Sequence, residues 1–426
     1  MLYLLSYFLL LGATTYTVGY VVNSFVKNRT NGYSFFLPVF LLFYVVPIFG
    51  DLITGLGFRE FYVQINEAIE DSTTSTIYNT YVSCLLVFFI WHSKKLRANY
   101  VKFYRDNVSK VANSFLKIYK KYFTLLFVIL IAPIFITLLL GDLSYYSVYS
   151  RMDRGDIVPD SHSFISKAVL FGVILGAFLI TSIILDKRLY NRDRRFIIPF
   201  IFFFLFVFFW IHGKRSIVAN YIVIQFGFLL ISQAISAKII LRQLLAVLVI
   251  FVLFLIGYGK NIADNAVDNY YSFRLDFTRD YGVKFAIYND LLLERYILPY
   301  DWASFLFNFT FYIPREWWID KPHPYAVYFT NSVFGNYGGS ESYGWGFTTS
   351  IFGEHISNMG WIGLLTAPTL IYIVFKYENK STNPFFKLIS ILIAILLIVL
   401  HPIAFVVLIL LYIIFLIKGE KRIIFR

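Results

Sequence analysis

A carboxylate and an imidazole stand side by side in the run Gly353-Glu354-His355-Ile356-Ser357-Asn358-Met359-Gly360. Either side chain could take the proton of a sugar hydroxyl as a general base. Histidine has the better-matched ordinary pKa, whereas glutamate would need its pKa raised by burial. A satisfied interfacial histidine would explain His355 equally well. Glu354 and His355 are therefore the candidate catalytic residues, and the residues alone leave the choice between them open.

A second group of residues could bind an anion. Lys214 and Arg215 form a short turn between two apolar runs, which places their charges at the depth of a membrane interface. The planar fork of a guanidinium suits the oxygens of a phosphate or diphosphate, although contact with ordinary lipid headgroups would use the same charges. The candidates for binding diphosphate or sugar are Lys214, Arg215, Arg274, Arg279, Arg315, Lys321, Trp317 and Trp318.

The segment from Pro314 to Pro322 concentrates charge and indole between two prolines. Because proline restricts its own backbone and that of the preceding residue, this pattern predicts a rigid loop. Such a loop could aim Arg315 and Lys321 at one anion. Ion pairs within the loop are the alternative, namely Arg315 with Asp320 or Glu316 with Lys321.

The elements that must position these residues are long and apolar. Of the 426 residues, 58% are hydrophobic and 15% are charged, and the mean hydropathy is +0.67. So few charges cannot cover a soluble domain of this length, and runs near twenty apolar residues cross hydrocarbon as helices. We predict about eleven spans, at 2–22, 33–50, 76–92, 122–141, 164–185, 196–212, 217–235, 243–258, 357–375, 386–400 and 402–417.

Positive charge alternates between the loops that connect these spans. Lysine and arginine gather in every second loop, above all in 93–121 and 187–195. Because loops rich in these residues stay in the cytoplasm, we expect the N-terminus outside and the C-terminus inside. The net charge of +13 thus follows membrane topology. It does not indicate binding to nucleic acid.

The predicted fold class is an all-α polytopic membrane protein with one large outer-face loop. By this topology 1–258 holds eight spans, 259–356 is the outer loop, 357–417 holds three spans, and 418–426 is a basic cytoplasmic tail. A loop as long as 259–356 is usually functional. Its apolar stretch from Ala303 to Ile313 is too short to span, and we interpret it as an interfacial or re-entrant segment.

Metal and redox chemistry have no signature in the chain. The single cysteine, Cys84, lies inside an apolar run, so neither an intramolecular disulfide nor a thiolate metal site is predicted. The histidines other than His355 are scattered without the spacing of metal ligands. No metal and no cofactor is therefore predicted.

Three motifs give the chain a resemblance to the Wzy-type polymerases, which join the oligosaccharide repeat units of O-antigen and similar polysaccharides. They are Gly213-Lys214-Arg215-Ser216 opening a helix, Ile313-Pro314-Arg315 through Lys321-Pro322, and Gly353-Glu354 through Gly360. The layout, many helices with a long outward loop late in the chain, is also similar. The arginine–glycine loop motif of some members is not evident here. The glycine–glutamate pairing of polymerases favours Glu354, and a histidine of the related O-antigen ligases favours His355.

The resemblance implies a GT-C-like bundle in the bacterial cytoplasmic membrane. It also implies a metal-independent glycosyltransferase that needs no cofactor and acts on undecaprenyl-diphosphate-linked oligosaccharides at the outer face. The implied partners are those lipid-linked glycans, membrane lipids and a chain-length regulator protein, but no nucleic acid. Cationic side chains would stabilise the leaving diphosphate, and a base near the acceptor hydroxyl would take its proton. These are the minimum groups that the glycosyl transfer needs.

Two other functions stay open beside the polymerase. An O-antigen ligase would differ only in its acceptor. A flippase or other transporter of lipid-linked oligosaccharides would place ionisable residues near the bilayer midplane and often show repeated halves. The predicted spans are nearly free of charge and show no repeat, which favours the enzyme.

Overall fold

The computed structural model describes residues 1–27, 29–147, 159, 161–213, 216–232, 234–246, 270–271, 273–275, 278–341, 346–381 and 383–418. Over these residues every regular element is helical. Seven helices there are long and apolar enough to cross a membrane, namely Leu2–Val26, Gly32–Thr54, Ser72–Leu96, Phe115–Leu140, Phe164–Tyr190, Arg195–His212 and Ile351–Lys380. The chain is therefore a polytopic α-helical membrane protein.

The other four predicted spans are not among these seven helices. Three of them, 217–235, 386–400 and 402–417, coincide with shorter apolar helices, namely α9 (Ser216–Ile231), α17 (Pro384–Val399) and α18 (Val406–Lys418). The fourth, 243–258, lies mostly outside the described residues. The total of eleven spans thus stays a prediction.

The chain folds as two compact units, which are described one at a time. Unit 1 comprises residues 1–101 and 243–426, and unit 2 comprises 102–242. The helices of unit 1 are α1 (Leu2–Val26), α2 (Gly32–Tyr44), α3 (Val46–Thr54), α4 (Val63–Glu70), the first part of α5 (Ser72–Leu140), α12 (Asp280–Ala286), η3 (Ile287–Leu292), α13 (Ala303–Thr310), α14 (Tyr325–Val333), α15 (Ile351–Met359), η4 (Gly360–Ile362), α16 (Gly363–Lys380), α17, η5 (Pro402–Phe405) and α18. The helices of unit 2 are the rest of α5, α6 (Leu143–Tyr146), α7 (His162–Tyr190), η2 (Arg195–Ile197), α8 (Ile198–His212) and α9.

The basic segment 93–121, predicted as a loop between two spans, is helical and belongs to α5. Its lysines, arginines, alanines and leucines favour a helix, and the segment contains no glycine or proline to stop one. The helical path bends at Tyr122, whose φ of −120° and ψ of 19° leave the helical region. Two spans are thus joined by a helix where the charge pattern predicts a loop.

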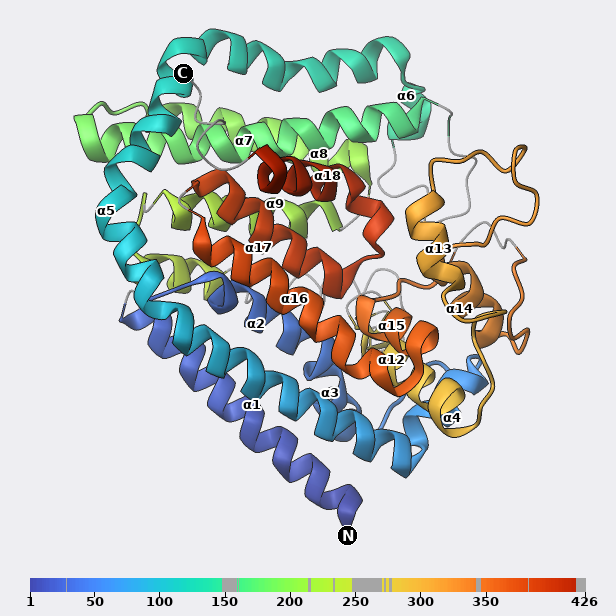
Figure 1. Cartoon of the computed structure of the whole chain (residues 1–426). Helices are drawn as coiled ribbons and strands as arrows, with labels where there is room; N and C mark the ends of the chain where they lie inside the picture. The colour runs from blue at the N-terminus through green and yellow to red at the C-terminus, as the bar shows by residue number, and fades with distance from the viewer. Residues whose placement is uncertain are drawn as a thin grey trace. The chain divides into compact units, whose positions relative to one another are not determined.

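An aromatic core holds the helices of unit 1 together around α2, which Figure 1 shows beside α16 and α17. Phe36 of α2, Phe89 of α5 and Phe375 of α16 are fully buried. The ring of Phe36 meets that of Phe89 at 5.1 Å and that of Phe375 at 5.6 Å between centroids, both edge-to-face. Such pairs stabilise packing by about 0.5–1.5 kcal/mol each beyond the apolar area they bury.

Segments that the charge pattern assigns to the same face meet at the same end of unit 1. At one end the Asn31 amide donates to the Ser93 carbonyl at 3.0 Å. At the other end the Tyr270 hydroxyl donates to Asp51 at 2.5 Å, and Arg279 Nε donates to the Val399 carbonyl at 2.9 Å. Parts of two predicted outer segments, 51–75 and 259–356, therefore lie together with the end of the predicted span 386–400. Which end faces outward stays a prediction.

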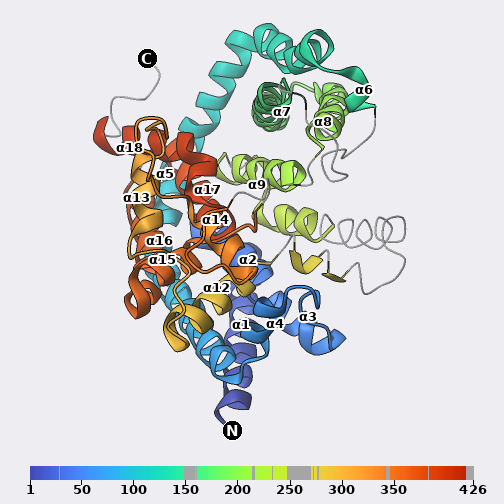
Figure 2. The ribbon, with the colours of Figure 1, turned by 90° about the vertical axis from the view of Figure 1, so that its right-hand side faces the viewer.

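The described part of the long loop is built of short helices that pack on the bundle. In Figures 1 and 2 α12 and α15 lie side by side, and α12 also contacts α4. The helix α13 (Ala303–Thr310) has eight residues, which is too short to cross a bilayer, as the sequence predicts. It packs on α15, from which the span Ile351–Lys380 begins.

Close helix packing organises unit 2. Figure 2 shows α7 and α8 side by side, viewed nearly along their axes. A Cβ added at Gly172 would lie 2.7 Å from the Phe208 ring, and one at Gly176 would lie 2.9 Å from Leu205. These two glycines, four residues apart, let the helices approach as small residues do in membranes.

Candidate functional site

The helix α15 presents a buried polar face. Glu354, Ser357 and Asn358 are spaced three and four residues apart, which places them on the same side of a helix. All three are buried. A polar stripe inside an otherwise apolar bundle must find hydrogen-bond partners there, because unpaired buried polar groups are costly.

The glycines of the Gly353–Gly363 motif allow the backbone contacts around this face. A Cβ at Gly353 would lie 3.1 Å from the carbonyl oxygen of Gly282 in α12, so the two helices touch there. Gly360 has a φ of +58° and a ψ of −138°, a positive-φ conformation that glycine adopts without strain, and it ends α15. The motif therefore has a packing role in addition to any chemical one.

Glu354 lies at the centre of what we call the Glu354 network, made of Ser304, Asn308, Glu354, Asn358 and His401. Its Oε1 accepts hydrogen bonds from Ser304 Oγ at 2.9 Å and Asn308 Nδ2 at 2.8 Å. Asn358 Nδ2 donates to Ser304 Oγ at 2.7 Å. His401 Nε2 lies 3.7 Å from Glu354 Oε1, too far for a hydrogen bond but close enough for an ion pair when the imidazole is protonated.

The Glu354 network keeps hydrogen-bonding capacity that the protein does not use. Asn308 Oδ1, Asn358 Oδ1 and His401 Nε2 are buried atoms without a hydrogen-bond partner. Glu354 itself is 1% exposed, while Asn308 and His401 are only partly buried and reach the surface. The remaining capacity therefore lies next to the two members that a ligand could meet. A hydroxyl group fits it, since it can both donate and accept.

The structure separates His355 from this network. His355 Nδ1 lies 2.9 Å from Thr366 Oγ1, and its ring packs edge-on against Phe305 at 4.8 Å. The imidazole that accompanies Glu354 is His401, in the turn before η5. Nothing in the sequence singles out His401 beyond its place between two apolar runs.

One helical turn from Glu354, Ser357 connects α15 to a second buried carboxyl group. Ser357 Oγ donates to Asp290 Oδ2 at 2.5 Å, and the Tyr325 hydroxyl lies 2.9 Å from Ser357 Oγ. Asp290 Oδ1 also accepts the Ile297 N–H at 2.8 Å. Burial raises the pKa of Asp290 to about 7 against the opposing effect of these hydrogen bonds. Asp290 belongs to η3, a π-helical turn of a kind frequent at functional sites.

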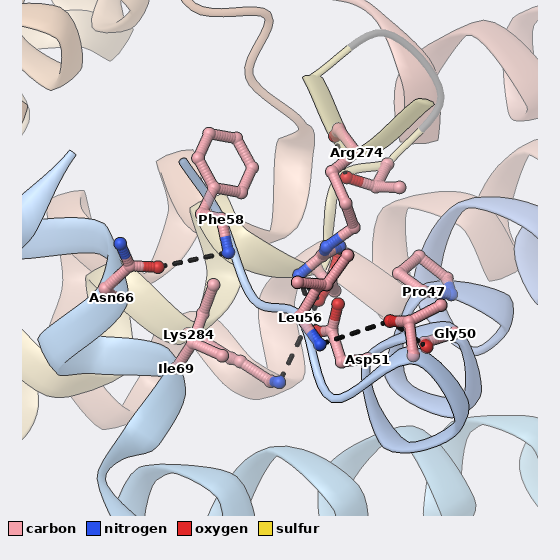
Figure 3. A network of polar contacts seen from close by, with 12 residues as sticks. Pro47, Gly50, Asp51, Leu56, Phe58, Asn66, Ile69, Arg274 and Lys284 are labelled. Carbon is pink, nitrogen blue, oxygen red and sulfur yellow. Dashed lines mark hydrogen bonds and ion pairs between the residues drawn. The ribbon is translucent and has the colours of Figure 1, made fainter. Parts of the chain in front are cut away.

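A separate ionic cluster, the Arg274 network, joins Asp51, Tyr270, Arg274, Asp280 and Lys284. Arg274 is fully buried and donates to both oxygens of Asp280, at 2.7 Å and 3.1 Å, and to Asp51 Oδ2 at 3.0 Å. Lys284 Nζ lies 3.8 Å from Asp280 Oδ2. Figure 3 shows Arg274, Asp51 and Lys284 pointing toward one another.

Charge is balanced within the Arg274 network. Two carboxylates face two cations, and each carboxylate oxygen has a partner. Burial lowers the pKa of Lys284, while the neighbouring Asp280 carboxylate opposes that shift. Arg274, a predicted diphosphate ligand, is thus already neutralised by the protein.

The other predicted cations bind backbone carbonyls. Arg315 donates to the carbonyls of Lys321 at 2.7 Å and Pro322 at 2.9 Å. Lys321 Nζ donates to the carbonyls of Phe311 at 3.0 Å and Ile313 at 2.7 Å. These contacts replace the Arg315–Asp320 and Glu316–Lys321 ion pairs that the sequence offered as an alternative. Arg279, as noted above, donates to the Val399 carbonyl.

The remaining predicted site residues are two tryptophans of the outer loop and two cations outside the described part of the chain. Trp317 is 83% exposed and Trp318 is partly buried. Lys214 and Arg215 lie outside the described residues, so the diphosphate clamp assigned to them stays a prediction. Within the described residues no cluster of three or more His, Cys, Asp or Glu could hold a metal ion.

No family model matches the chain, and no curated protein or solved structure matches it either.

Proposed function

We propose that the protein is a polysaccharide polymerase that joins undecaprenyl-diphosphate-linked repeat units at the outer face of the bacterial cytoplasmic membrane. In this proposal the bundle is GT-C-like, with about eleven spans and the C-terminus inside. The observation that carries the proposal is the Glu354 network. It pairs a buried carboxylate with a partly exposed imidazole where the long loop packs on a membrane span.

The proposed reaction needs a base but no general acid. The acceptor hydroxyl attacks the anomeric carbon of the donor sugar, the bond from that carbon to the diphosphate oxygen breaks, and the diphosphate leaves with the electron pair. The hydroxyl proton passes to Nδ1 of His401, which accepts the Ile403 N–H at 3.4 Å, so that Nε2 carries the hydrogen that faces Glu354. Glu354, 3.7 Å away, stabilises the resulting imidazolium, as the carboxylate does in hydrolase triads.

The leaving diphosphate calls for positive charge that the protein has not neutralised. Arg274 faces two carboxylates, so its charge is balanced. Arg315 binds neutral carbonyls instead and keeps its full charge. Arg315 is therefore a better-supported diphosphate partner than Arg274 among the described candidates, because a developing anion is stabilised by net positive charge nearby.

The test is to replace Glu354 by Gln in cells that make the polymer. Glutamine keeps an oxygen for Ser304 and Asn308 but cannot stabilise an imidazolium. Loss of a base slows a reaction by about 10²–10⁴-fold, so lipid-linked single repeats should accumulate at the outer face. His355→Gln is the matched control, since His355 lies off the network, and it should leave chain length unchanged.

Three results would contradict the proposal. Normal chain length in Glu354→Gln at native expression would remove Glu354 from the reaction. Repeats trapped at the inner face would identify a transporter. Full-length polymer that stays on its lipid carrier would identify a ligase.

A further inference from the structure

The outer loop exposes large apolar side chains around the end of α13. Phe309 is 76% exposed, Tyr312 71%, Trp317 83% and Ile319 84%. We call these four residues the aromatic wedge. Side chains of this size are rarely left in water together, so four exposed ones within the short segment 309–319 indicate an interaction surface.

The wedge is held in shape by its own backbone contacts. Arg315 and Lys321 donate to four carbonyls between them, of Phe311, Ile313, Lys321 and Pro322. The Trp317 N–H also donates to the Pro314 carbonyl at 3.2 Å. Because Arg315 and Lys321 bind backbone carbonyls, the loop is fixed on either side of Trp317 and Ile319, and these two side chains are exposed.

The wedge follows a helix that is fixed to a membrane span. The helix α13 that leads into it is fixed to the start of the span Ile351–Lys380, since Asn308 bonds Glu354 and Phe305 packs on His355. That span exposes Trp361, Ile362 and Leu365 in its early turns. Apolar surface at the start of a membrane span faces lipid, and α13, which leads into the wedge, is fixed to that end of the span.

We propose that the aromatic wedge inserts into the interfacial region of the outer leaflet and fixes the outer loop to the bilayer surface. Tyrosine and tryptophan suit that depth, because their rings sit among acyl chains while the O–H or N–H stays wet. A surface that binds a glycan combines aromatic rings with side chains that can hydrogen-bond to sugar hydroxyls. The side chains of Phe309 and Ile319 have no such groups. The inference does not rest on the proposed enzymatic function.

Site-specific fluorescence can test this on the full chain. Cys84 is the only cysteine, so Cys84→Ser gives a background for labelling. An environment-sensitive fluorophore is attached at Ile319→Cys and, as the control, at Ser340→Cys, an exposed position of the same loop outside the wedge. Both proteins are reconstituted in phosphatidylcholine nanodiscs with or without a phosphatidylcholine spin-labelled near the headgroup.

We expect the spin-labelled lipid to quench the fluorophore at 319 at least twofold more than at 340. The emission at 319 should also shift to the blue and resist quenching by aqueous iodide. Tyr312→Cys repeats the test if Ile319→Cys does not fold. Equal lipid quenching at wedge and control positions would overturn the proposal. Protection from iodide without lipid quenching would also overturn it, because it would mean that protein covers the wedge.

Discussion

The two buried polar networks of unit 1 differ in how completely they are bonded. In the Arg274 network both oxygens of Asp51 and of Asp280 have partners and cations balance the carboxylates, and Arg274 Nε is its one buried polar atom without a hydrogen-bond partner. In the Glu354 network the carboxylate meets neutral donors and one imidazole, and three buried polar atoms have no partner. The first network therefore uses its charge to hold the chain, whereas the second keeps hydrogen-bonding capacity for a ligand.

This difference has an energetic basis. Removing one partner of a buried ion pair leaves an uncompensated charge in a medium that solvates it poorly, which costs about 3–5 kcal/mol. A carboxylate held by neutral donors can be replaced by an amide with little change in charge balance. The Arg274 network should therefore respond to substitution in folding, and the Glu354 network in activity.

The largest expected effect is on folding, in Arg274→Ala. This change leaves the carboxylates of Asp51 and Asp280 facing each other without the guanidinium, so we expect the folded protein to be destabilised by about 3–5 kcal/mol. Thermal unfolding in detergent and the yield of monodisperse protein measure it. Asp51→Asn, at the partly exposed end of the network, should cost less. A variant as stable as the parent would show that the network is not what holds this end together.

The next effect is on activity, in His401→Gln and in its combination with Glu354→Gln. If the two residues act as one base, the double variant should be no slower than the slower single variant, with each loss within about 10²–10⁴-fold. The rate at which lipid-linked repeats are consumed provides the measurement, and unfolding temperatures should stay close to that of the parent. Losses that multiply would mean that the residues work independently.

A smaller effect concerns the pH dependence of stability, through Asp290. Burial raises its pKa from 3.8 to about 7, so between these values the folded state holds a proton that the unfolded state has released. Asp290 therefore makes the free energy of unfolding fall as pH rises through this window, by at most about 1.4 kcal/mol per pH unit. Asp290→Asn should remove that slope, and unfolding temperatures measured from pH 4 to 8 would show it. An unchanged slope would assign the proton to another group.

The smallest effect on stability is expected for Arg315→Gln. Its two hydrogen bonds to carbonyls lie in a partly exposed loop, so their loss should cost about 1 kcal/mol. Cleavage of the loop 309–322 by a protease should become faster, while Glu316→Gln serves as an exposed control. Polymerisation should fall as well, because Arg315 is the proposed partner of the leaving diphosphate. Normal polymerisation with faster cleavage would show that the guanidinium only holds the loop.

Local patterns in the sequence determined the class of this protein and the position of its key helix. Apolar length identifies a span whatever the rest of the chain does, because the bilayer sets that length. Seven predicted spans are accordingly present as helices long enough to cross. The sequence places Glu354 just before the predicted span 357–375, and in the structure Glu354 lies in the first turns of the helix Ile351–Lys380. The charge pattern did not predict that 93–121 is helical. A run of basic residues indicates on which side of the membrane a segment lies, but it does not indicate the conformation of that segment.

Only the tertiary structure decided which partners the charged residues take. A guanidinium can bind a carboxylate, a carbonyl or a ligand phosphate, and sequence spacing does not distinguish these. In the fold Arg274 meets Asp51, distant in the chain, while Arg315 meets carbonyls of its own loop. The pairing of Glu354 with His401, and its separation from His355, follow from the same cause. Neighbours on a helix point to different sides, and packing brings distant turns together.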